Sequence, residues 1–521
     1  MPRRILAGLL LMFGLSAPAL AQSRAEIELT MKRATVFMVE KVATRGGYVW
    51  SYLPDFSRRW GELEAYPTMV WVQPPGTGTM GHLFLDAYHA TGDEYYYRAA
   101  MRAAKALIAG QHRSGGWNYF IDFAGPGSTK RWYSTIGRNA WRMEEFQHHG
   151  DNATFDDAGT SEAMQFLLRL YLEKRDARLR PALDRAISFV LKSQYPNGGW
   201  PQRYPHDPRF PAYASYITFN DDVAAENIKF LLMVHHTLGD RRALPAIRRA
   251  MEIFLVTQQP APQAGWGLQH SMDLKPAAAR SYEPRALATH TTAANVRQLM
   301  DFYRMTGEQR FLARIPEALA WLESVRLPER QVRNGRAFPT FVEIGTNRPI
   351  YVHRRGSNVV NGEYYWDYSP EATLGHYSAF RAIDLPALRR DYAALSAKPR
   401  EELLRTSPLR NPPPLPRYFA SGENTGSDLN ANAASAPAAL IASLNREGWW
   451  PTPLRATSHP YRGPGSPRPA PGDYRTTHVG DATDTSPYTT DKPVTGISTA
   501  SYIANMAALI GALSAPRREA R

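Results

Sequence analysis

Two acidic clusters carry side chains that could bind a cation or move a proton. The sequence TFDDAGT places Asp156 and Asp157 just before an apolar run, and ITFNDDVAAE places Asp221 and Asp222 before another. Aspartate is a preferred helix N-cap, so capping explains one acid at each site. Capping does not explain two adjacent acids at both sites. Several carboxylates that converge on one cleft would suit a hard cation such as Ca²⁺.

A stiff aromatic loop suggests contact with sugars. The sequence WPQRYP places Arg203 and Tyr204 directly after Trp200. Aromatic faces suit sugar rings, and the fork of a guanidinium group suits carboxylates. We therefore expect this loop to line a cleft for an acidic sugar.

Two later loops are rich in basic residues. One contains His270 and Arg280, and the other contains Arg348 and Arg354. A solvated basic surface is the simpler interpretation of such charge runs. A single histidine such as His270 also belongs to a protein core more often than to a catalytic site.

A Gly-Gly-Trp tripeptide follows a glutamine twice in the chain. The full copies are QHRSGGW, which ends at Trp117, and QYPNGGW, which ends at Trp200; weaker copies occur near residues 46, 265 and 448. A recurring motif indicates repeat architecture. Glycine can end a helix in a left-handed conformation, and the tryptophan would then seal a hairpin.

Twelve segments carry the apolar spacing of helices and fall into six pairs. A long loop joins the two helices of each pair, and a short connection leads to the next pair. We therefore predict an all-α fold, an α/α toroid of about six helical hairpins with the long loops and the functional residues on one rim. The predicted helices span residues 30–42, 80–90, 94–111, 159–174, 177–194, 223–238, 242–258, 291–305, 308–322, 371–383, 433–445 and 497–513.

The N-terminus has the pattern of a secretory signal peptide. Two arginines precede an apolar stretch, and Ala19-Leu20-Ala21 forms a small-residue cleavage site. We predict cleavage after Ala21 and a periplasmic or secreted protein. A single toroid domain is expected over residues 22–521, with residues 400–432 as a Pro-rich surface excursion or linker.

The composition and net charge limit the kinds of molecule that this protein is expected to bind. The 521 residues include no cysteine, which excludes thiolate chemistry, and carry a net charge of +14. Positive charge attracts polyanions, and an acidic polysaccharide is the partner we expect. No nucleic-acid-binding module and no apolar run long enough to span a membrane is visible in the sequence. We expect a monomer.

Six motifs in order resemble the polysaccharide lyase family 10 pectate lyases. They are QYPNGGWPQRYP, YITFNDD, QH, ARSYE, EIGTNRPI and GEYYW, and the resemblance covers roughly residues 158–381. It implies an α/α toroid that cleaves polygalacturonate by β-elimination with Ca²⁺ as cofactor.

The resemblance also assigns roles to individual residues. Arg280 in ARSYE is similar to the catalytic base of the family, and Asp156 and Asp221 are similar to its aspartates. With Asp157, these two aspartates are the predicted metal ligands. The predicted substrate-binding residues are Trp200, Arg203, Tyr204, His270, Arg348 and Arg354. The chain departs from the family pattern at Ser271 and Arg355, where the family has acids, and these departures do not touch Arg280.

The implied reaction removes the C5 proton of a uronate, which lies next to the carboxylate. Negative charge builds on that carboxylate, and a cation or an arginine would stabilise it. Free arginine has a pKa of about 12.5 or above, so an arginine base predicts an alkaline pH optimum.

Two other classes of protein fit the same residues. A glycoside hydrolase on the same kind of toroid would use a carboxylate pair such as Asp156 and Asp221. A non-catalytic protein would bind acidic polysaccharide without turnover. A lyase leaves an unsaturated uronate that absorbs ultraviolet light, which distinguishes it from both.

Overall fold

The computed structural model describes residues 23–139, 144–355, 363–371, 373–374, 378–422, 436–454 and 494–514. The predicted signal peptide lies outside these ranges. Among the described residues, no helix is both long enough and apolar enough to cross a membrane.

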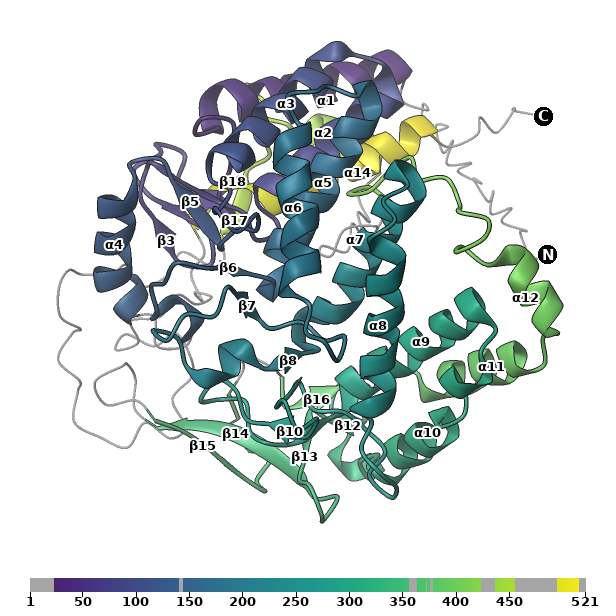
Figure 1. Ribbon diagram of the computed structural model, residues 1–521. Coiled ribbons are helices and arrows are strands. Elements are labelled where there is room, and N and C mark those ends of the chain that lie inside the picture. Colours follow the sequence, from purple (N-terminus) through teal and green to yellow (C-terminus); the bar gives the residue numbers. More distant parts are fainter. Residues whose placement is uncertain are drawn as a thin grey trace, which may run out of the picture.

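Helices dominate the described ranges (Figure 1). They are α1 (Arg24–Phe37), α2 (Thr77–Thr91), α3 (Glu94–Ala109), α4 (Pro126–Thr135), α5 (Gly159–Lys174), α6 (Arg180–Ser193), α7 (Val223–Leu238), α8 (Ala243–Val256), α9 (Thr289–Thr306), α10 (Ile315–Ser324), α11 (Leu385–Ser396), α12 (Arg400–Thr406), α13 (Pro437–Ser443) and α14 (Thr499–Ser514).

Most predicted helices are present, and two of them, α5 and α7, begin and end at the predicted residues. The helix predicted over residues 371–383 is wrong. The described part of that range ends in a strand, Phe380–Arg381, and the next helix starts only at Leu385. The side chain of Asp384 accepts a hydrogen bond from the amide of Ala387, so this N-cap sets the start of α11.

The helices form an inner and an outer layer. Every residue from Thr77 to Ala87 in α2 and from Gly159 to Leu170 in α5 is buried. Helix α5 contacts both α2 and α7, while α3 packs on α2, α6 on α5 and α8 on α7. The first helix of each of these pairs therefore lies inside and the second lies outside.

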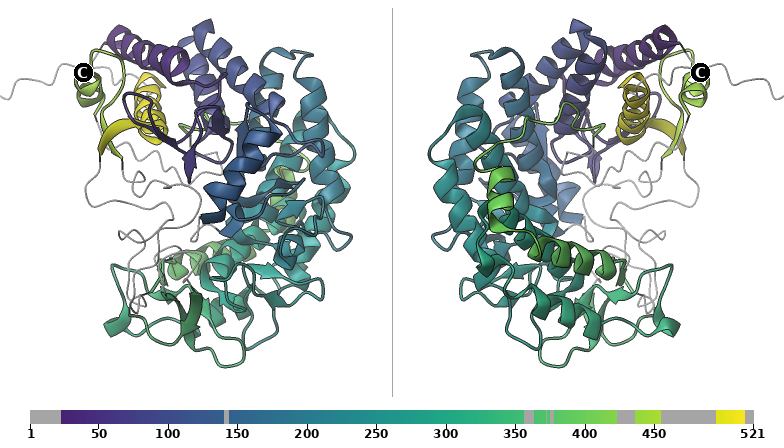
Figure 2. Two further views of the ribbon diagram at one scale, coloured as in Figure 1. Left: turned by 90° about the vertical axis from the view of Figure 1, so that its left-hand side faces the viewer. Right: turned by 90° about the vertical axis from the view of Figure 1, so that its right-hand side faces the viewer.

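The two ends of the described chain lie together. Helix α14 contacts α1 and α2, and Figure 2 shows it, in yellow, beside the purple N-terminal helices. This arrangement brings the last predicted hairpin next to the first. The mainly helical class is confirmed, and the closed toroid of six hairpins stays a prediction.

The long loops contain short antiparallel strands, which the helical pattern did not reveal. The largest sheet has the order β17-β18-β1-β2-β3, and a second has the order β11-β13-β14-β15. The strands are β1 (Ser51–Tyr52), β2 (Arg59–Trp60), β3 (Glu64–Ala65), β4 (Met69–Trp71), β5 (Phe120–Asp122), β6 (Ala153–Thr154), β7 (Arg203–Tyr204), β8 (Ile217–Thr218), β9 (Gln269–His270), β10 (Pro276–Ala277), β11 (Leu287–Ala288), β12 (Phe338–Pro339), β13 (Phe341–Val342), β14 (Pro349–Arg355), β15 (Glu363–Asp367), β16 (Phe380–Arg381), β17 (Thr452–Leu454) and β18 (Val494–Ser498). The remaining sheets are β10-β9-β8, β12-β16, β4-β5 and β6-β7.

The Gly-Gly-Trp motif ties each outer helix to the next one. The Nε2 of Gln194, just after α6, donates to the carbonyl of Gly198 at 3.0 Å and to that of Ala246 in α8 at 2.9 Å. Trp200 Nε1 donates to the carbonyl of Val190 at 2.9 Å. Gln111 makes the equivalent bonds between α3 and α6. The motif is therefore a structural connector in both copies.

Gly198→Ala is expected to destabilise the chain more than Gly239→Ala. Both glycines have positive φ, +97° and +66°, which costs an alanine about 1–3 kcal/mol. A Cβ at Gly198 would also collide with the carbonyl oxygen of Arg249, whereas a Cβ at Gly239 meets nothing within 4 Å. Denaturant midpoints of both variants test this. Equal decreases in the two denaturant midpoints would show that the close approach of Gly198 to α8 does not affect stability.

Part of the predicted Pro-rich excursion is anchored to the inner helices. Asp86 of α2 accepts hydrogen bonds from the amides of Phe419 at 2.9 Å and Ser421 at 2.8 Å. The same carboxylate forms a buried ion pair with Arg169 of α5 at 2.6 Å. Residues 417–421 therefore pack on the helices, and residues 423–435 lie outside the described ranges. The division into one domain stays a prediction.

Glu162 gives the fold a testable pH dependence. This residue of α5 is 1% exposed, and burial, with a smaller contribution from Glu226, raises its pKa to about 8. A raised folded pKa means that its stabilising effect is complete below the unfolded value of about 4.3 and is lost as the pH rises through 8.

We expect Glu162→Gln to have the same free energy of unfolding as the wild type near pH 4 and a higher one near pH 9. Glutamine stays neutral at both pH values. Chemical unfolding at the two pH values measures the difference. The exposed Glu401→Gln serves as the control. Identical pH dependence of the wild type and Glu162→Gln would contradict the assignment.

Candidate active site

A cavity of about 700 Å³ collects charged side chains from the loops and helix starts. Its lining consists of Glu62, Glu145, Asp157, Phe219, Asn220, Asp221, Asp222, Arg280, His290, Thr291, Ala294, Arg336, Ser378 and Arg381. Acids and bases from distant parts of the sequence meet in this one cavity.

The two acidic clusters form the same unusual turn. Asp157 and Ala158 before α5, and Asp221 and Asp222 before α7, all have φ between +50° and +56°. Neither helix has a side-chain hydrogen bond at its N-cap. Helix capping is therefore not the role of these acids. The turns instead bring Asp157 and Asp221 to the cavity, and the two turns contact each other.

Arg280 lies at the centre of a group of buried carboxylates. It is 3% exposed and forms ion pairs with Asp156, with Glu283 at 2.9 Å and with Glu145 at 3.2 Å. Its backbone amide also donates to Glu283 at 2.8 Å, and Tyr119 donates its hydroxyl to Asp156 at 2.5 Å. Arg280 is thus held in one orientation by partners on three elements.

The electrostatics of this group follow from burial and pairing. Burial would raise the pKa of Asp156, but the Arg280 guanidinium and hydrogen bonds from neighbours including Tyr119 lower it to about 2. Burial would lower the pKa of Arg280, but Asp156 and Glu283 raise it well above its ordinary value. Asp156 is therefore ionised and Arg280 protonated in this arrangement.

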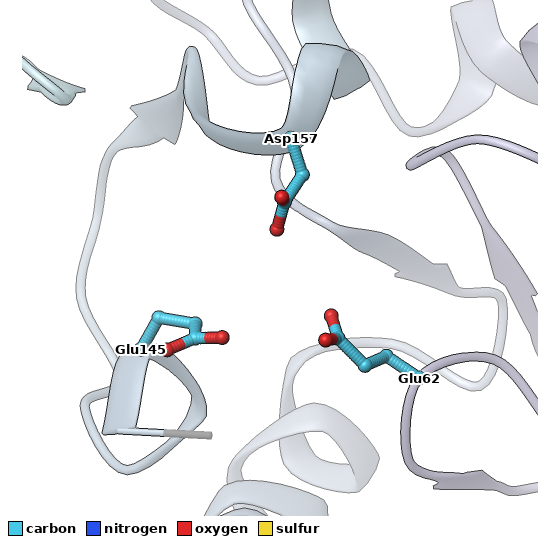
Figure 3. A group of neighbouring side chains, drawn as sticks. All are labelled: Glu62, Glu145 and Asp157. Atoms are coloured by element: carbon cyan, nitrogen blue, oxygen red, sulfur yellow. The ribbon is translucent and has the colours of Figure 1, made fainter. Parts of the chain in front are cut away.

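Three carboxylates form a second group beside Arg280. Glu62, Glu145 and Asp157 point toward one another in Figure 3, and each offers an oxygen within 4.8 Å of the other two. Gln73 donates its Nε2 to Glu62 at 2.8 Å and to Asp157 at 2.9 Å. The three side chains come from the β2–β3 connection, from the loop after α4 and from the turn before α5.

Burial is the main cause of the raised pKa values of two acids in this group. Burial, then Asp156 and Asp221, raises the pKa of Asp157 well above its usual range. Burial raises the pKa of Glu145 to about 8, although Arg280 opposes this shift. Close oxygen donors that repel each other are the donor set that a hard divalent cation prefers. Glu62, Glu145 and Asp157 fit such a cation because each offers an oxygen within 4.8 Å of the other two.

Asp221 lies in the same cavity but outside the three-carboxylate group. Burial and the charge of Asp156 raise its pKa well above its usual range. Asn220 donates its side-chain amide to Asp221 at 2.7 Å. Asp157 is thus the one predicted metal ligand that belongs to the three-carboxylate group.

Several predicted substrate-binding residues lie in the core instead. Trp200 is fully buried within the hairpin, and its predicted contact with substrate stays a prediction. His270 is also fully buried, and burial lowers its pKa to about 4. Its Nε2 accepts from the amide of Gly267 at 3.1 Å. Both side chains pack in the core, which agrees with the simpler interpretation of His270.

Arg203 is buried and does not line the described cavity. Its guanidinium lies 5.1 Å from the ring centre of Tyr119 and 4.5 Å from that of Phe210, and it donates to Asn152 at 3.2 Å. Its predicted role in substrate binding stays a prediction. Tyr204 is half-buried against Phe189, and its predicted role stays a prediction.

The structure describes one of the two predicted basic side chains of the β13–β14 region. Arg348 is exposed and stacks over the ring of Tyr368 at 3.4 Å, and it is not among the described residues that line the cavity. Arg354 belongs to β14, where it pairs with Tyr364 of β15. The side chains of Arg354 and Arg355 lie outside the described part of the structure.

Residues 123–367 match a family model described as pectic acid lyase. The chain matches the pectic acid lyases. The matched segment contains Glu145, Asp157, Asp221 and Arg280, so the predicted resemblance is confirmed over the centre of the site. Glu62 lies outside that segment. The match to pectic acid lyases supports a lyase enzyme.

Solved structures show a weaker likeness. The family 10 polysaccharide lyase from Cellvibrio cellulosa is 20% identical, with a TM-score of 0.36 over 52% of this chain and 84% of that chain. A mutant of that lyase in complex with trigalacturonic acid gives the same identity and TM-score, over 52% and 85%. An α-1,6-mannanase from Salegentibacter is 11% identical, with a TM-score of 0.38 over 94% and 99%. No curated protein matches the chain.

Some residues of the site were missed from the sequence. Glu62 and Glu145 belong to no recognised motif, and only the fold brings them to Asp157. Glu283 could have been found, because it stands three residues after Arg280 within ARSYE and forms an ion pair with it. No sequence motif marked Arg336 or Arg381 as a site residue.

Proposed function

We propose that this chain is an exported polysaccharide lyase that cleaves polygalacturonate by β-elimination. The observation that carries the proposal is Arg280, buried among carboxylates in a large cavity and within the segment that matches pectic acid lyases. The family match supports a lyase. The substrate, the arginine base and the export rest on the sequence pattern together with this cavity.

We infer that Glu62, Glu145 and Asp157 hold Ca²⁺. Three close carboxylates with raised pKa values for Glu145 and Asp157 are a suitable donor set. When bound, Ca²⁺ would attract the uronate carboxylate and stabilise the negative charge that builds on it.

Arg280 is the proposed base, and its neighbours control when it can act. The reaction transfers the C5 proton to the base, forms the C4=C5 double bond and breaks the bond between C4 and O4. Arg280 cannot accept a proton while it is ionised and paired with Asp156, Glu283 and Glu145. Weaker pairing with these carboxylates would lower its pKa toward the working range.

The hydrolase alternative has less support. It needs a free carboxylate pair, but Asp156 is paired with Arg280 and its pKa is lowered to about 2. Asp156 could act only as the ionised member of such a pair, and as nucleophile or base it would have to leave its ion pair with Arg280.

The test is incubation of the mature chain with polygalacturonate, with added Ca²⁺ or with chelator, at neutral and alkaline pH. We expect ultraviolet absorbance from unsaturated uronate, and a lower rate with chelator. New reducing ends without absorbance would indicate a hydrolase. Binding without any product would indicate a non-catalytic polysaccharide-binding protein.

A further inference from the structure

The cavity has a cationic part that the proposed chemistry does not use. Besides the acids and Arg280, its lining includes Arg336, Arg381 and His290. None of the three was predicted as a site residue. Arg336 and Arg381 come from the segments around β12 and β16, and His290 belongs to α9.

The fold places the two arginines close together. Strand β12 pairs antiparallel with β16, and Phe338 lies opposite Arg381. Arg336 stands two residues before Phe338, so it enters the cavity beside the same ladder. Arg336 Nη1 donates to the hydroxyl of Ser378 at 2.7 Å, and Arg381 Nε donates to the hydroxyl of Thr340 at 3.2 Å. The Ser378 hydroxyl group orients the Arg336 guanidinium without neutralising its charge.

Arg336 and Arg280 differ sharply in their surroundings. Arg280 is buried and paired with three carboxylates, whereas Arg336 is exposed and has no ion pair with any residue that the structure describes. An exposed guanidinium at a cavity wall keeps donors for a ligand carboxylate, and its planar fork suits bidentate binding.

The acidic side chains of the cavity oppose the binding of an acidic substrate unless a basic side chain contacts its carboxylates. Glu62, Glu145, Asp157, Asp221 and Asp222 line the same space, and at alkaline pH, where these acids ionise, they would repel a polyanionic chain. His290 adds an uncharged polar atom, because its Nδ1 is buried and has no hydrogen-bond partner among the described residues.

We propose that Arg336 and Arg381 form a binding site for a uronate carboxylate of the substrate and set the preference for acidic over neutral or esterified polysaccharide. This inference rests on the proposed lyase function for its substrate class. It assigns to these two residues the role that the sequence suggested for Arg348 and Arg354.

The test compares Arg336→Ala with Arg330→Ala. Arg330 is exposed, is not among the described residues that line the cavity, and its loss changes the net charge equally. We expect Arg336→Ala to raise KM for polygalacturonate about 10-fold to 100-fold with little change in kcat, the pattern of a lost binding contact. Arg330→Ala is expected to match the wild type.

A second readout separates this inference from the lyase function itself. Calorimetric titration of a short oligogalacturonate into each protein measures binding whether or not turnover occurs. We expect weaker binding by Arg336→Ala, an intermediate loss in Arg336→Lys, and no difference for a fully methyl-esterified oligomer. Unchanged KM and unchanged affinity in Arg336→Ala, or no binding by the wild type, would overturn the proposal. If the wild type shows lyase activity and Arg336→Ala binds the oligogalacturonate as tightly as the wild type does, this inference is wrong and the lyase function stands.

Discussion

Arg280→Ala is expected to lower the rate of polygalacturonate cleavage by about 10²-fold to 10⁴-fold, the usual contribution of a general base. The side chain is buried, lines the cavity and is oriented by Asp156, Glu145 and Glu283. The initial rate of absorbance increase at saturating substrate measures the loss. A variant that keeps most of the wild-type rate would exclude Arg280 as the base.

The same substitution is also expected to destabilise the chain. Removing one partner of a buried ion pair typically costs about 3–5 kcal/mol, since the remaining carboxylates stay buried without their cation. Arg280→Lys keeps the positive charge and separates the two effects. We expect the lysine variant to retain most of the stability and to lose most of the activity.

The pH profile gives an independent check on Arg280. The neighbouring carboxylates raise its pKa, so the deprotonated fraction grows only toward high pH. We expect the wild-type rate to rise from neutral to alkaline pH. A flat rate over this range would count against arginine as the base.

Asp157→Asn is expected to weaken activation by Ca²⁺ by at least about 10-fold to 100-fold, the loss typical even for residues that only support a metal ligand. Asp157 belongs to the group whose oxygens lie within 4.8 Å of one another. The Ca²⁺ concentration for half-maximal rate measures the effect. Ca²⁺ should also raise the unfolding temperature of the wild type more than that of the variant.

Asp222→Asn provides the matched control for Asp157→Asn. Asp222 lines the same cavity and loses the same charge, but it is not part of the three-carboxylate group. Equal weakening by both substitutions would mean that general cavity charge attracts the ion. Weakening by neither would remove Glu62, Glu145 and Asp157 as the metal site.

Local patterns in the sequence were sufficient for most of the helices and for singling out Arg280. The apolar spacing of residues 159–174 and 223–238 predicts α5 and α7 to the residue, and a left-handed residue ends each of these helices. The ARSYE motif likewise identifies Arg280. These features depend on neighbours along the chain, which the sequence contains in full.

The tertiary structure alone decided which side chains meet. Glu62 and Asp157 are far apart in sequence and join only because β2, β3 and the turn before α5 border one cavity. Trp200 and His270 have residue types suited to sugar binding, yet packing buries them. Residue type and spacing thus predict what a side chain can do, whereas burial and the distances between elements determine whether it does so.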